Sequence, residues 1–417
     1  MTELKDDNMV TVAAIGAGNR MNIYSALHGH GMRVVAVVDP DDARREALAA
    51  RCGVADNMRF SSWDHFIRHD RCADAAIICS PDRMHFAQAV AAIERGYDVL
   101  LEKPIAQSLS ECIEIADKAR MHGRVVAVCH VLRHNRYFRK FKDLISNGSL
   151  GRIISINHIE AVGIERMTHS FVRGLWRNEH ESNPMILSKA CHDLDLLVWL
   201  TGRNCLHVSS YGSLTWFRQD NAPAGSTPRC TDGCLIEHKC PYSAIDLYYR
   251  RRRWLRHFNI PEGADIDNFI LHQLRTGPYG RCVYRCDNDV VDHQVVSLLM
   301  HDDITINFSM DAFTRHSGRK THCMMSHGEI IGDERYLTVR HFAADTEEVV
   351  YDFSDCYGET SGHGGGDIDL VRDFIKAVRS RDTENLTTNI STSIESHRIA
   401  FEIEQRRKST MKSTVLI

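Results

Sequence analysis

The sequence lacks any long apolar run. No stretch approaches the roughly 18 consecutive apolar residues of a membrane helix. The opening residues, Met1 to Asn8, are polar and acidic and show no signal pattern of basic, then apolar, then small residues. We therefore expect a cytoplasmic protein without a membrane partner.

An excess of basic charge is also missing. The 417 residues carry 51 Lys and Arg against 55 Asp and Glu, a net charge of −4. General nucleic-acid binders carry a basic surplus, so no nucleic-acid partner is expected. The run Arg250–Arg253 is better explained as a solvated helix face or a partner contact.

Internal repeats and low-complexity tracts are absent as well. Hydrophobic residues make up 43% of the chain and charged residues 25%, which is ordinary globular composition. At roughly 150 residues per domain, the length predicts two or three domains.

Strand and helix patterns alternate through the first 130 residues. Strands are expected at Val10–Ile15, Arg33–Val38, Ala75–Cys79, Asp98–Leu101 and Arg124–Cys129, and helices at Asp41–Arg51, Met84–Arg95 and Leu109–His122. Such alternation predicts right-handed βαβ units and a doubly wound parallel sheet. We therefore predict an α/β fold with a Rossmann-like NAD(P)-binding domain over residues 1–130.

The pattern changes after about residue 150. Arg152–Glu160, Val295–Leu299 and Ile304–Met310 alternate in polarity, as strands with one wet face do. Helices are expected at His192–Leu200, Asp367–Arg379 and Thr392–Arg407. Residues 131–417 are predicted to form a second, α+β domain with a large, mostly antiparallel open sheet and a Cys-rich insertion at about 221–290.

A Gly-x-Gly turn, Gly16-Ala17-Gly18, lies between the first strand and a helical pattern. In a dinucleotide fold the first glycine permits the tight turn, and the second lets the backbone approach a pyrophosphate. Asp39, at the end of the next strand, suits a ribose 2′-hydroxyl and would repel a 2′-phosphate, which favours NAD. The nearby Arg44 and Arg45 keep NADP as the less favoured cofactor. The first predicted cofactor contacts are Gly16, Gly18, Asn19, Arg20, Met21 and Asp39.

Two later strand ends carry further motifs, ICSPDRMH at residues 78–85 and VLLEKPI at residues 99–105. The Glu-Lys-Pro of the second resembles the signature of the Gfo/Idh/MocA oxidoreductases (glucose–fructose oxidoreductase, inositol dehydrogenase and relatives). The resemblance continues through Trp176-Arg177, the segment KACHDLD at 189–195, GHGGGD at 362–367 and SHR at 396–398.

The resemblance implies a role for two residues. Lys103 would lie beside the nicotinamide, and His192 would contact the reacting hydroxyl. Alcohol oxidation needs a base for the hydroxyl proton, and histidine titrates near neutrality. A lysine cation would polarise the developing alkoxide. The remaining predicted cofactor contacts are Ser80, Pro81, His85, Glu102 and Lys103.

One departure from the family concerns the helix that carries His192. Many members have an aspartate where this chain has Ser188, and the glycine run usual after Trp-Arg is replaced by Ser182–Met185. Lys189 is therefore predicted as a third catalytic residue that takes part of the aspartate's role. The alternative for His192 is a histidine buried in the core, with its ring nitrogens hydrogen-bonded and no role in catalysis.

Three residues are predicted to contact substrate. Asp195 shares a helical face with His192 and would orient the imidazole or bind a substrate hydroxyl. Arg177 follows from the resemblance. His363 lies in a glycine loop that would close over a polar ligand, before a helix capped by Asp367; a simple flexible turn is the alternative. Arg133 and Tyr137 are weaker candidates.

Fourteen cysteines are present, and five of them cluster. In a cytosolic chain such clustering favours metal over disulfides. Four thiolates suit a tetrahedral zinc, which would staple a loop-rich insertion that has no core of its own. The predicted ligands are Cys230, Cys234, Cys240 and Cys282, with Cys286 as the alternative fourth ligand. The alternative is that these thiols bind no metal. The cysteine spacing is not the one usual for an iron–sulfur cluster.

The expected activity is NAD-dependent hydride transfer to or from a secondary hydroxyl of a sugar, a sugar derivative or a cyclitol. The alternative is a glycoside hydrolase that retains NAD and acts by transient oxidation, elimination, water addition and re-reduction. A non-enzymatic NAD-binding regulator would leave Lys103, Lys189 and His192 without a task. The resemblance further implies a homodimer or homotetramer that associates through the open sheet of the second domain.

Overall fold

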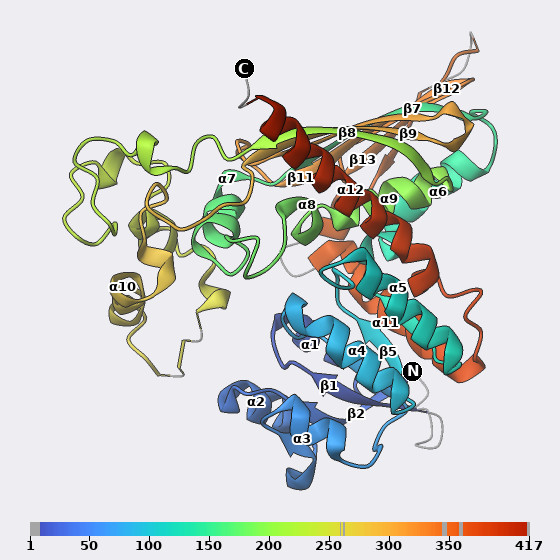
Figure 1. The fold of residues 1–417 in the computed structure, drawn as a ribbon, viewed down its shortest axis with the longest axis horizontal. Coiled ribbons are helices and arrows are strands. Elements are labelled where there is room, and N and C mark those ends of the chain that lie inside the picture. Colours follow the sequence, from blue (N-terminus) through green and yellow to red (C-terminus); the bar gives the residue numbers. More distant parts are fainter. Residues whose placement is uncertain (1–8, 259, 262, 344–347, 358–361, 415–417) are drawn as a thin grey trace.

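Two β-sheets, one above the other in Figure 1, organise the chain, and a lateral insertion projects beyond the upper sheet. The computed structural model describes residues 9–258, 260–261, 263–343, 348–357 and 362–414. Met1 to Asn8, on which the expectation about a signal pattern rests, lie outside these ranges. No helix among the described residues is both long and apolar enough to cross a membrane.

The lower sheet is a doubly wound parallel sheet, as predicted. Its strands are β1 Val10–Ile15, β2 Met32–Val38, β3 Arg59–Phe60, β4 Ala75–Ile78, β5 Asp98–Leu101 and β6 Val126–Val128. Their order is β3-β2-β1-β4-β5-β6. All residues of β4 and β5 are buried, as expected for strands covered on both faces. The order reverses between β1 and β4, so the crevice for ligands lies at the carboxyl ends of these strands.

Polar side chains cap the N-termini of three of the helices around this sheet. These helices are α1 Asn19–Tyr24, α2 Asp42–Cys52, α3 Trp63–Arg68, α4 His85–Glu94 and α5 Leu109–Met121. The Asp41 carboxylate accepts a bond from the Arg44 amide to cap α2, which ends at Gly53 in the left-handed region. The Ser108 hydroxyl caps α5 in the same way. The patterns did not predict β3 and α3, which are only two and six residues long.

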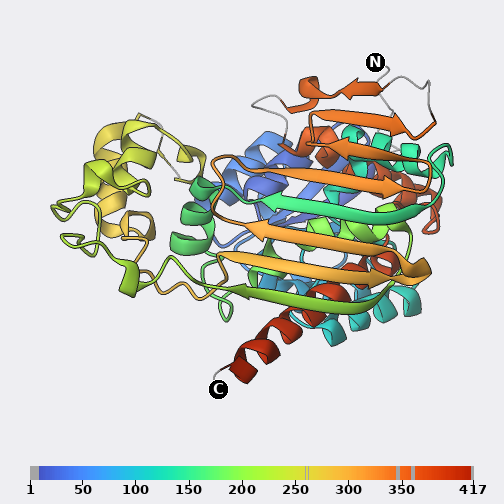
Figure 2. The ribbon, with the colours of Figure 1, turned by 90° about the horizontal axis from the view of Figure 1, so that it is seen from above.

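The upper sheet has eight strands and one open face. The strands are β7 Ile153–Ala161, β8 Cys205–Ser213, β9 His293–Met300, β10 Thr305–Asp311, β11 Gly318–Met325, β12 Gly328–Gly332, β13 Tyr336–His341 and β14 Val349–Asp352. In the order β14-β13-β12-β11-β7-β10-β9-β8, only β7 and β10 pair in parallel, so the predicted mostly antiparallel sheet is confirmed. Figure 2 shows its open face, with the helices behind it.

Helices cover the other face of the upper sheet. The helices before, between and after its strands are α6 Arg136–Ser146, α7 Ile164–Arg166, α8 Met185–Ser188, α9 Cys191–Thr201, α10 Ile266–Thr276, α11 Gly366–Ser380 and α12 Ile390–Thr414. Of these, α12 packs against both β8 and α9 (Figure 1). It also packs against α5 of the lower sheet. The last helices therefore join the two sheets.

The last part of the chain returns to the lower sheet. Helix α11 packs against α1, β1 and β5, and the Val128 amide of β6 donates to the Thr388 carbonyl. The strands of the two sheets divide near the predicted boundary at residue 130, but α11 and α12 lie across it. The predicted cap of α11 is wrong: Gly365 occupies the N-cap, and Asp367 lies in the first turn.

The insertion joins β8 to β9 and contains α10. It has a small apolar core, which corrects the expectation of a loop without one; the core residues are Ala244, Leu247, Tyr248, Phe258, Ile270 and Leu274. The basic run pairs with acids of the same chain. Arg250 contacts Glu237, Arg251 and Arg253 contact Glu165, and Arg252 contacts Asp267.

The first glycine of the Gly-x-Gly turn allows a test of this fold. Gly16 has φ +84°, and a Cβ there would lie 2.8 Å from the Cys79 carbonyl oxygen. Gly16→Ala should lower the free energy of unfolding by about 2 kcal/mol or more. Gly18→Ala is the control, since Gly18 has φ −79° and no atom within 4 Å of an added Cβ. The control should lose less than about 1 kcal/mol. Urea denaturation measures both, and equal losses would contradict the assigned close approach.

Candidate functional site

The carboxyl end of the lower sheet brings four loops together. They follow β1, β4, β5 and β6 and carry Gly16–Gly18, Ser80, Lys103 and His130. In the first loop, the Ala17 amide donates to Asp39 Oδ2 at 2.7 Å. The Asp41 amide donates to Asp39 Oδ1 at 2.8 Å. Asp39 therefore supports the Gly-x-Gly turn from the end of β2, beside the exposed Asn19.

Arg20 points into the protein and not toward a cofactor. Its Nε donates to Glu102 Oε1 at 2.7 Å, and its Nη2 donates to Asp367 Oδ1 at 2.5 Å. The Tyr24 hydroxyl donates to the same Glu102 oxygen at 2.6 Å. Burial raises the pKa of Glu102, but Arg20 and the Tyr24 hydrogen bond outweigh it and hold the pKa below its usual value. Arg20 and Glu102 are predicted as cofactor contacts. In the structure, Arg20 links Glu102, at the end of β5, to Asp367 of α11.

Met21 occupies the position of the third glycine and has no exposed surface. Its side chain packs in the apolar core, so a contact of Met21 with a cofactor, which stays a prediction, would be made by its backbone. A spacing motif does not say which way a helical side chain faces.

His85 ties together two loops of the crevice. Its Nδ1 lies 2.7 Å from the Pro104 carbonyl oxygen, and its Nε2 lies 3.0 Å from the Ser80 carbonyl oxygen. The ring is fully buried, while Ser80 is half-buried and Pro81 is exposed. Among these predicted contacts, Pro81 is exposed and the Ser80 hydroxyl donates to Gln88 Oε1 at 2.6 Å, whereas His85 holds the loops in place from behind.

Lys103 and His192 meet at the crevice from the two halves of the chain. The Lys103 Nζ donates to the Ser188 carbonyl at 2.7 Å, and Ser188 ends α8, just before His192 in the first turn of α9. Where many family members have an aspartate, a backbone carbonyl holds the lysine. Burial, with the Lys103 charge next, lowers the pKa of His192 well below its ordinary value. Its imidazole is neutral at pH 7, and its buried Nδ1 has no hydrogen-bond partner among the described residues.

Three more histidines surround His192. The His130 ring lies 6.0 Å from it, the His363 ring 5.9 Å, and the His397 ring lies 5.7 Å from His130. Burial lowers the pKa of each, to about 3 for His397. The sequence reasoning missed His130, although its place directly after a buried strand was a usable signal, because ligand-facing residues sit at such strand ends.

Comparison with known proteins agrees with this geometry. Residues 10–130 match the family model described as "Oxidoreductase family, NAD-binding Rossmann fold", and residues 142–249 match "Oxidoreductase family, C-terminal alpha/beta domain", both of the Gfo/Idh/MocA type. The chain belongs to the Gfo/Idh/MocA family of oxidoreductases.

Relatives of this oxidoreductase differ in their named reactions. Inositol 2-dehydrogenase 1 from Saccharopolyspora erythraea is 30% identical over 43% of this chain and 50% of its own length. The 2,7-anhydro-N-acetylneuraminate hydratase of Mediterraneibacter gnavus is 28% identical over 41% of this chain and 43% of its own length. The match thus spans about half the length of these two relatives. An inositol dehydrogenase homologue complexed with NAD⁺, from Azotobacter vinelandii, has the same fold, with a TM-score of 0.68 at 15% identity and 98% coverage of both chains.

His363 is linked to the turn that carries Arg20. Its Nδ1 lies 3.1 Å from Asp367 Oδ2, and Asp367 also binds Arg20. The Asn135 side chain donates to the His363 carbonyl at 2.9 Å. About a third of the His363 side chain is exposed, so it remains open to a ligand on the side of His192.

Lys189 belongs to a separate group of charges under the upper sheet. Its ammonium pairs with Glu160 of β7, which also contacts Arg319 of β11 at 2.9 Å. Arg319 binds Asp193 at 2.6 Å as well. Burial lowers the pKa of Lys189, while Glu160 opposes the shift. Lys189 thus pairs within this group, while Lys103 is held by the Ser188 carbonyl, and the catalytic role expected of Lys189 stays a prediction.

Asp195 does not face a substrate. It has no exposed surface, and Arg133 donates to both its oxygens, at 2.8 and 2.6 Å. Asp195 Oδ1 also lies 3.5 Å from His130 Nε2. Tyr137 is buried in the core beside Phe138. Arg133 and Asp195 thus form a buried ion pair behind the histidines, which corrects their assignment to the substrate.

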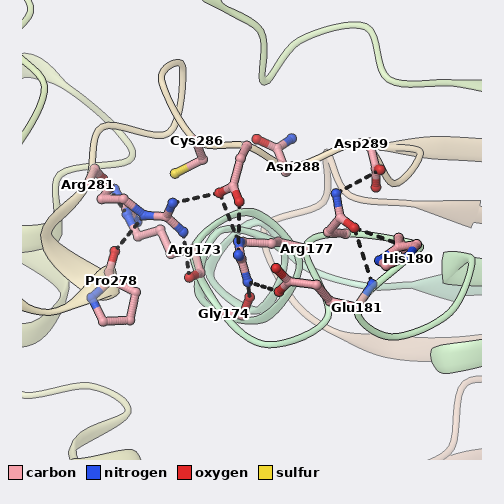
Figure 3. Close-up of polar contacts among 12 residues, drawn as sticks. Arg173, Gly174, Arg177, His180, Glu181, Pro278, Arg281, Cys286, Asn288 and Asp289 are labelled. Carbon is pink, nitrogen blue, oxygen red and sulfur yellow. Dashed lines mark hydrogen bonds and ion pairs between the residues drawn. The ribbon is translucent and has the colours of Figure 1, made fainter. Parts of the chain in front are cut away.

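Arg177 lies at the junction with the insertion (Figure 3). Its Nε and Nη2 donate to the Asp287 carboxylate at 2.8 and 2.9 Å, and its Nη1 pairs with Glu181 at 2.9 Å. The hydrogen bonds that Arg177 donates to Asp287 raise its pKa above the ordinary value. Arg177 therefore fastens the insertion, and its predicted contact with substrate is corrected.

The four predicted zinc ligands line one small cavity. Cys230, Cys234, Cys240 and Cys282 all face it, whereas Cys286 does not. Within the described ranges, no three or more His, Cys, Asp or Glu side chains are already arranged to hold a metal ion.

The two ion pairs should differ in their effect on stability. Asp195→Asn leaves a buried Arg133 without its counter-charge, which should cost about 3–5 kcal/mol of unfolding free energy. Asp287→Asn removes a pair whose carboxylate is 53% exposed, so it should cost about 1 kcal/mol or less. Urea denaturation of the full chain measures both. A loss for Asp195→Asn no larger than that for Asp287→Asn would refute the assigned buried pair.

Proposed function

We propose that the chain is a dehydrogenase that transfers hydride between NAD and a secondary hydroxyl of a sugar, a sugar derivative or a cyclitol. The observation that carries the proposal is the position of the Lys103 ammonium, which follows β5 and donates to the Ser188 carbonyl just before His192, whose pKa is lowered by burial and then by the Lys103 charge. A base and a cation at one point are what alcohol oxidation requires of a protein.

Different residues of the crevice would carry out different parts of the oxidation. Lys103 holds the hydroxyl oxygen and stabilises negative charge that develops on it. His192 takes the hydroxyl proton as the carbonyl forms. NAD, when bound, supplies the acceptor for the hydride that leaves the same carbon. His363, partly exposed beside His192, is suited to a neighbouring hydroxyl of a polyol.

The residues around the Gly-x-Gly turn suit NAD better than NADP. The Asp39 carboxylate lies at the end of β2, where it would repel a 2′-phosphate. The two nearby arginines are engaged by acids, Arg44 with Asp41 at 3.5 Å and Arg45 with Asp42 at 2.7 Å. They are therefore poorly placed to attract a phosphate.

The NAD-retaining glycoside hydrolase is the second candidate. The observation in its favour is the group of His130, His192, His363 and His397, which exceeds what a single proton transfer needs. Elimination and water addition would use further acid and base groups. The relative named as a hydratase fits this direction.

By family resemblance we also propose a cytoplasmic homodimer or homotetramer. The open face of the upper sheet would form its contact, where Tyr211 and Val295 pair across strands with 61% and 50% of their surfaces exposed. Light scattering of the pure protein gives the mass that tests this.

Product stoichiometry separates the two activities. The pure protein with NAD should form about one NADH per molecule of cyclitol or sugar consumed, because a dehydrogenase releases the hydride with its cofactor. Absorbance of NADH and chromatography of the substrates measure the ratio over free sugars, cyclitols and glycosides. Release of sugar from a glycoside with almost no NADH would replace the dehydrogenase by the hydrolase.

Substitution of the two central residues tests the assigned roles. Lys103→Ala and His192→Ala should each lower turnover at least about 100-fold, a typical loss for an acid–base group, while NAD binding stays within a few-fold. Lys142→Ala is the control, because Lys142 also donates to a helix-end carbonyl, that of Leu200, but lies outside the crevice. Steady-state rates and NAD titration measure both effects. Loss of NAD binding in His192→Ala would contradict its placement on the substrate side.

A further inference from the structure

The cysteines of the insertion come together from two separate stretches of chain. Cys230, Cys234 and Cys240 follow one another in turns, and Cys282 arrives after α10. All four line the same cavity, which has room for a single water-sized particle and not for a cluster. The cavity also receives Arg173, the last residue of a π-helix at Met167–Arg173.

Arg173 is a buried cation with no carboxylate partner among the described residues. It is 1% exposed, and its Nε and Nη2 donate to the carbonyls of Arg281 and Tyr242 at 2.8 and 2.7 Å. Its Nη1 has no partner in the part of the chain that the structure describes. Glu237 lines the same cavity, but Arg250 and Ser243 already bind its carboxylate. A buried, unpaired charge is costly, so an anionic neighbour is needed.

A divalent metal ion bound by four thiolates would be that anionic neighbour of Arg173. Four thiolates bring more negative charge than a divalent cation neutralises, and Arg173 would offset the excess. We propose that Cys230, Cys234, Cys240 and Cys282 form a structural tetrahedral zinc site, with Arg173 as its buried counter-charge. The site is independent of the activity proposed for the crevice.

The choice among the cysteines follows from their surroundings. Cys286 lies outside the cavity lining, and its thiol donates to the Cys282 carbonyl at 3.3 Å. Cys230 Sγ accepts the Ala244 amide at 3.4 Å, a bond that stabilises a thiolate. The cavity lining therefore favours Cys282 over Cys286 as the fourth ligand of the proposed site.

Zinc binding requires the sulfurs to close in. As the chain stands they do not surround one point, and zinc needs four sulfurs at about 2.3 Å. Closure would fasten the insertion to the π-helix, because metal binding and ordering of such a loop are coupled.

Metal content of the full chain tests the site. The protein, purified under reducing conditions and reconstituted with zinc, should hold about one zinc per chain by mass spectrometry of the elements. Cys282→Ser should lose that zinc, and Cys286→Ser is the matched control that keeps it. Cobalt in place of zinc should give the intense sulfur-to-metal absorption of a tetrahedral thiolate site. Absence of stoichiometric metal, iron in its place, or loss of zinc in Cys286→Ser would each overturn the proposal.

The counter-charge is tested by changing Arg173 alone. Arg173→Met should weaken zinc binding at least tenfold in competition with a chelator, whereas Arg173→Lys should keep most of the affinity. Equal affinity of the methionine variant and the parent chain would refute the role of Arg173. Should that variant fail to fold, the metal content of the parent chain and of the two cysteine variants still decides the proposal.

Discussion

The ion pairs of Arg20 are the constraint on which the crevice depends. One guanidinium binds Glu102, the residue before Lys103, and Asp367, which contacts His363. It therefore fixes groups from the Gly-x-Gly turn, the end of β5 and the start of α11 relative to one another. Buried pairs of this kind add little net stability but enforce one geometry, because any displaced arrangement leaves a charge unpaired. The cofactor turn and the substrate side are thus set by the same contact.

The distribution of charge around the crevice follows from this arrangement. Burial keeps the surrounding histidines neutral, while the carboxylates nearest to them are taken by arginines: Glu102 by Arg20 and Asp195 by Arg133. The Lys103 ammonium, held by a carbonyl, is left as a cation that can act on a bound oxygen. Lys189, which the sequence places close by, is neutralised by Glu160 in a different group. Position in the chain alone does not distinguish the two lysines; their partners do.

The sequence predicted the strands and turns that depend on local residue patterns. It did not predict contacts between side chains that lie far apart in the chain. Buried apolar runs predicted β1 and β5 with their bounds, and the Gly-x-Gly turn with Asp39 placed the crevice. The pairs of Arg133 with Asp195 and of Arg177 with Asp287 join residues 62 and 110 positions apart. No spacing rule connects such positions, so both arginines could be taken for substrate contacts. Met21 shows a second limit, since a motif position does not reveal whether a side chain faces the core.

The insertion and the crevice are connected through one stretch of chain. The π-helix ends at Arg173, beside the cysteine cavity, and the chain then runs through Arg177 to Ser188, whose carbonyl holds Lys103. Gly174 allows no side chain there, because a Cβ would lie 2.6 Å from the His169 carbonyl oxygen. Arg281 of the insertion donates to the Arg173 carbonyl (Figure 3), and Asp287 binds Arg177. Helices α9 and α12 also pack against α8, so the insertion and these two helices together hold the segment that carries Ser188.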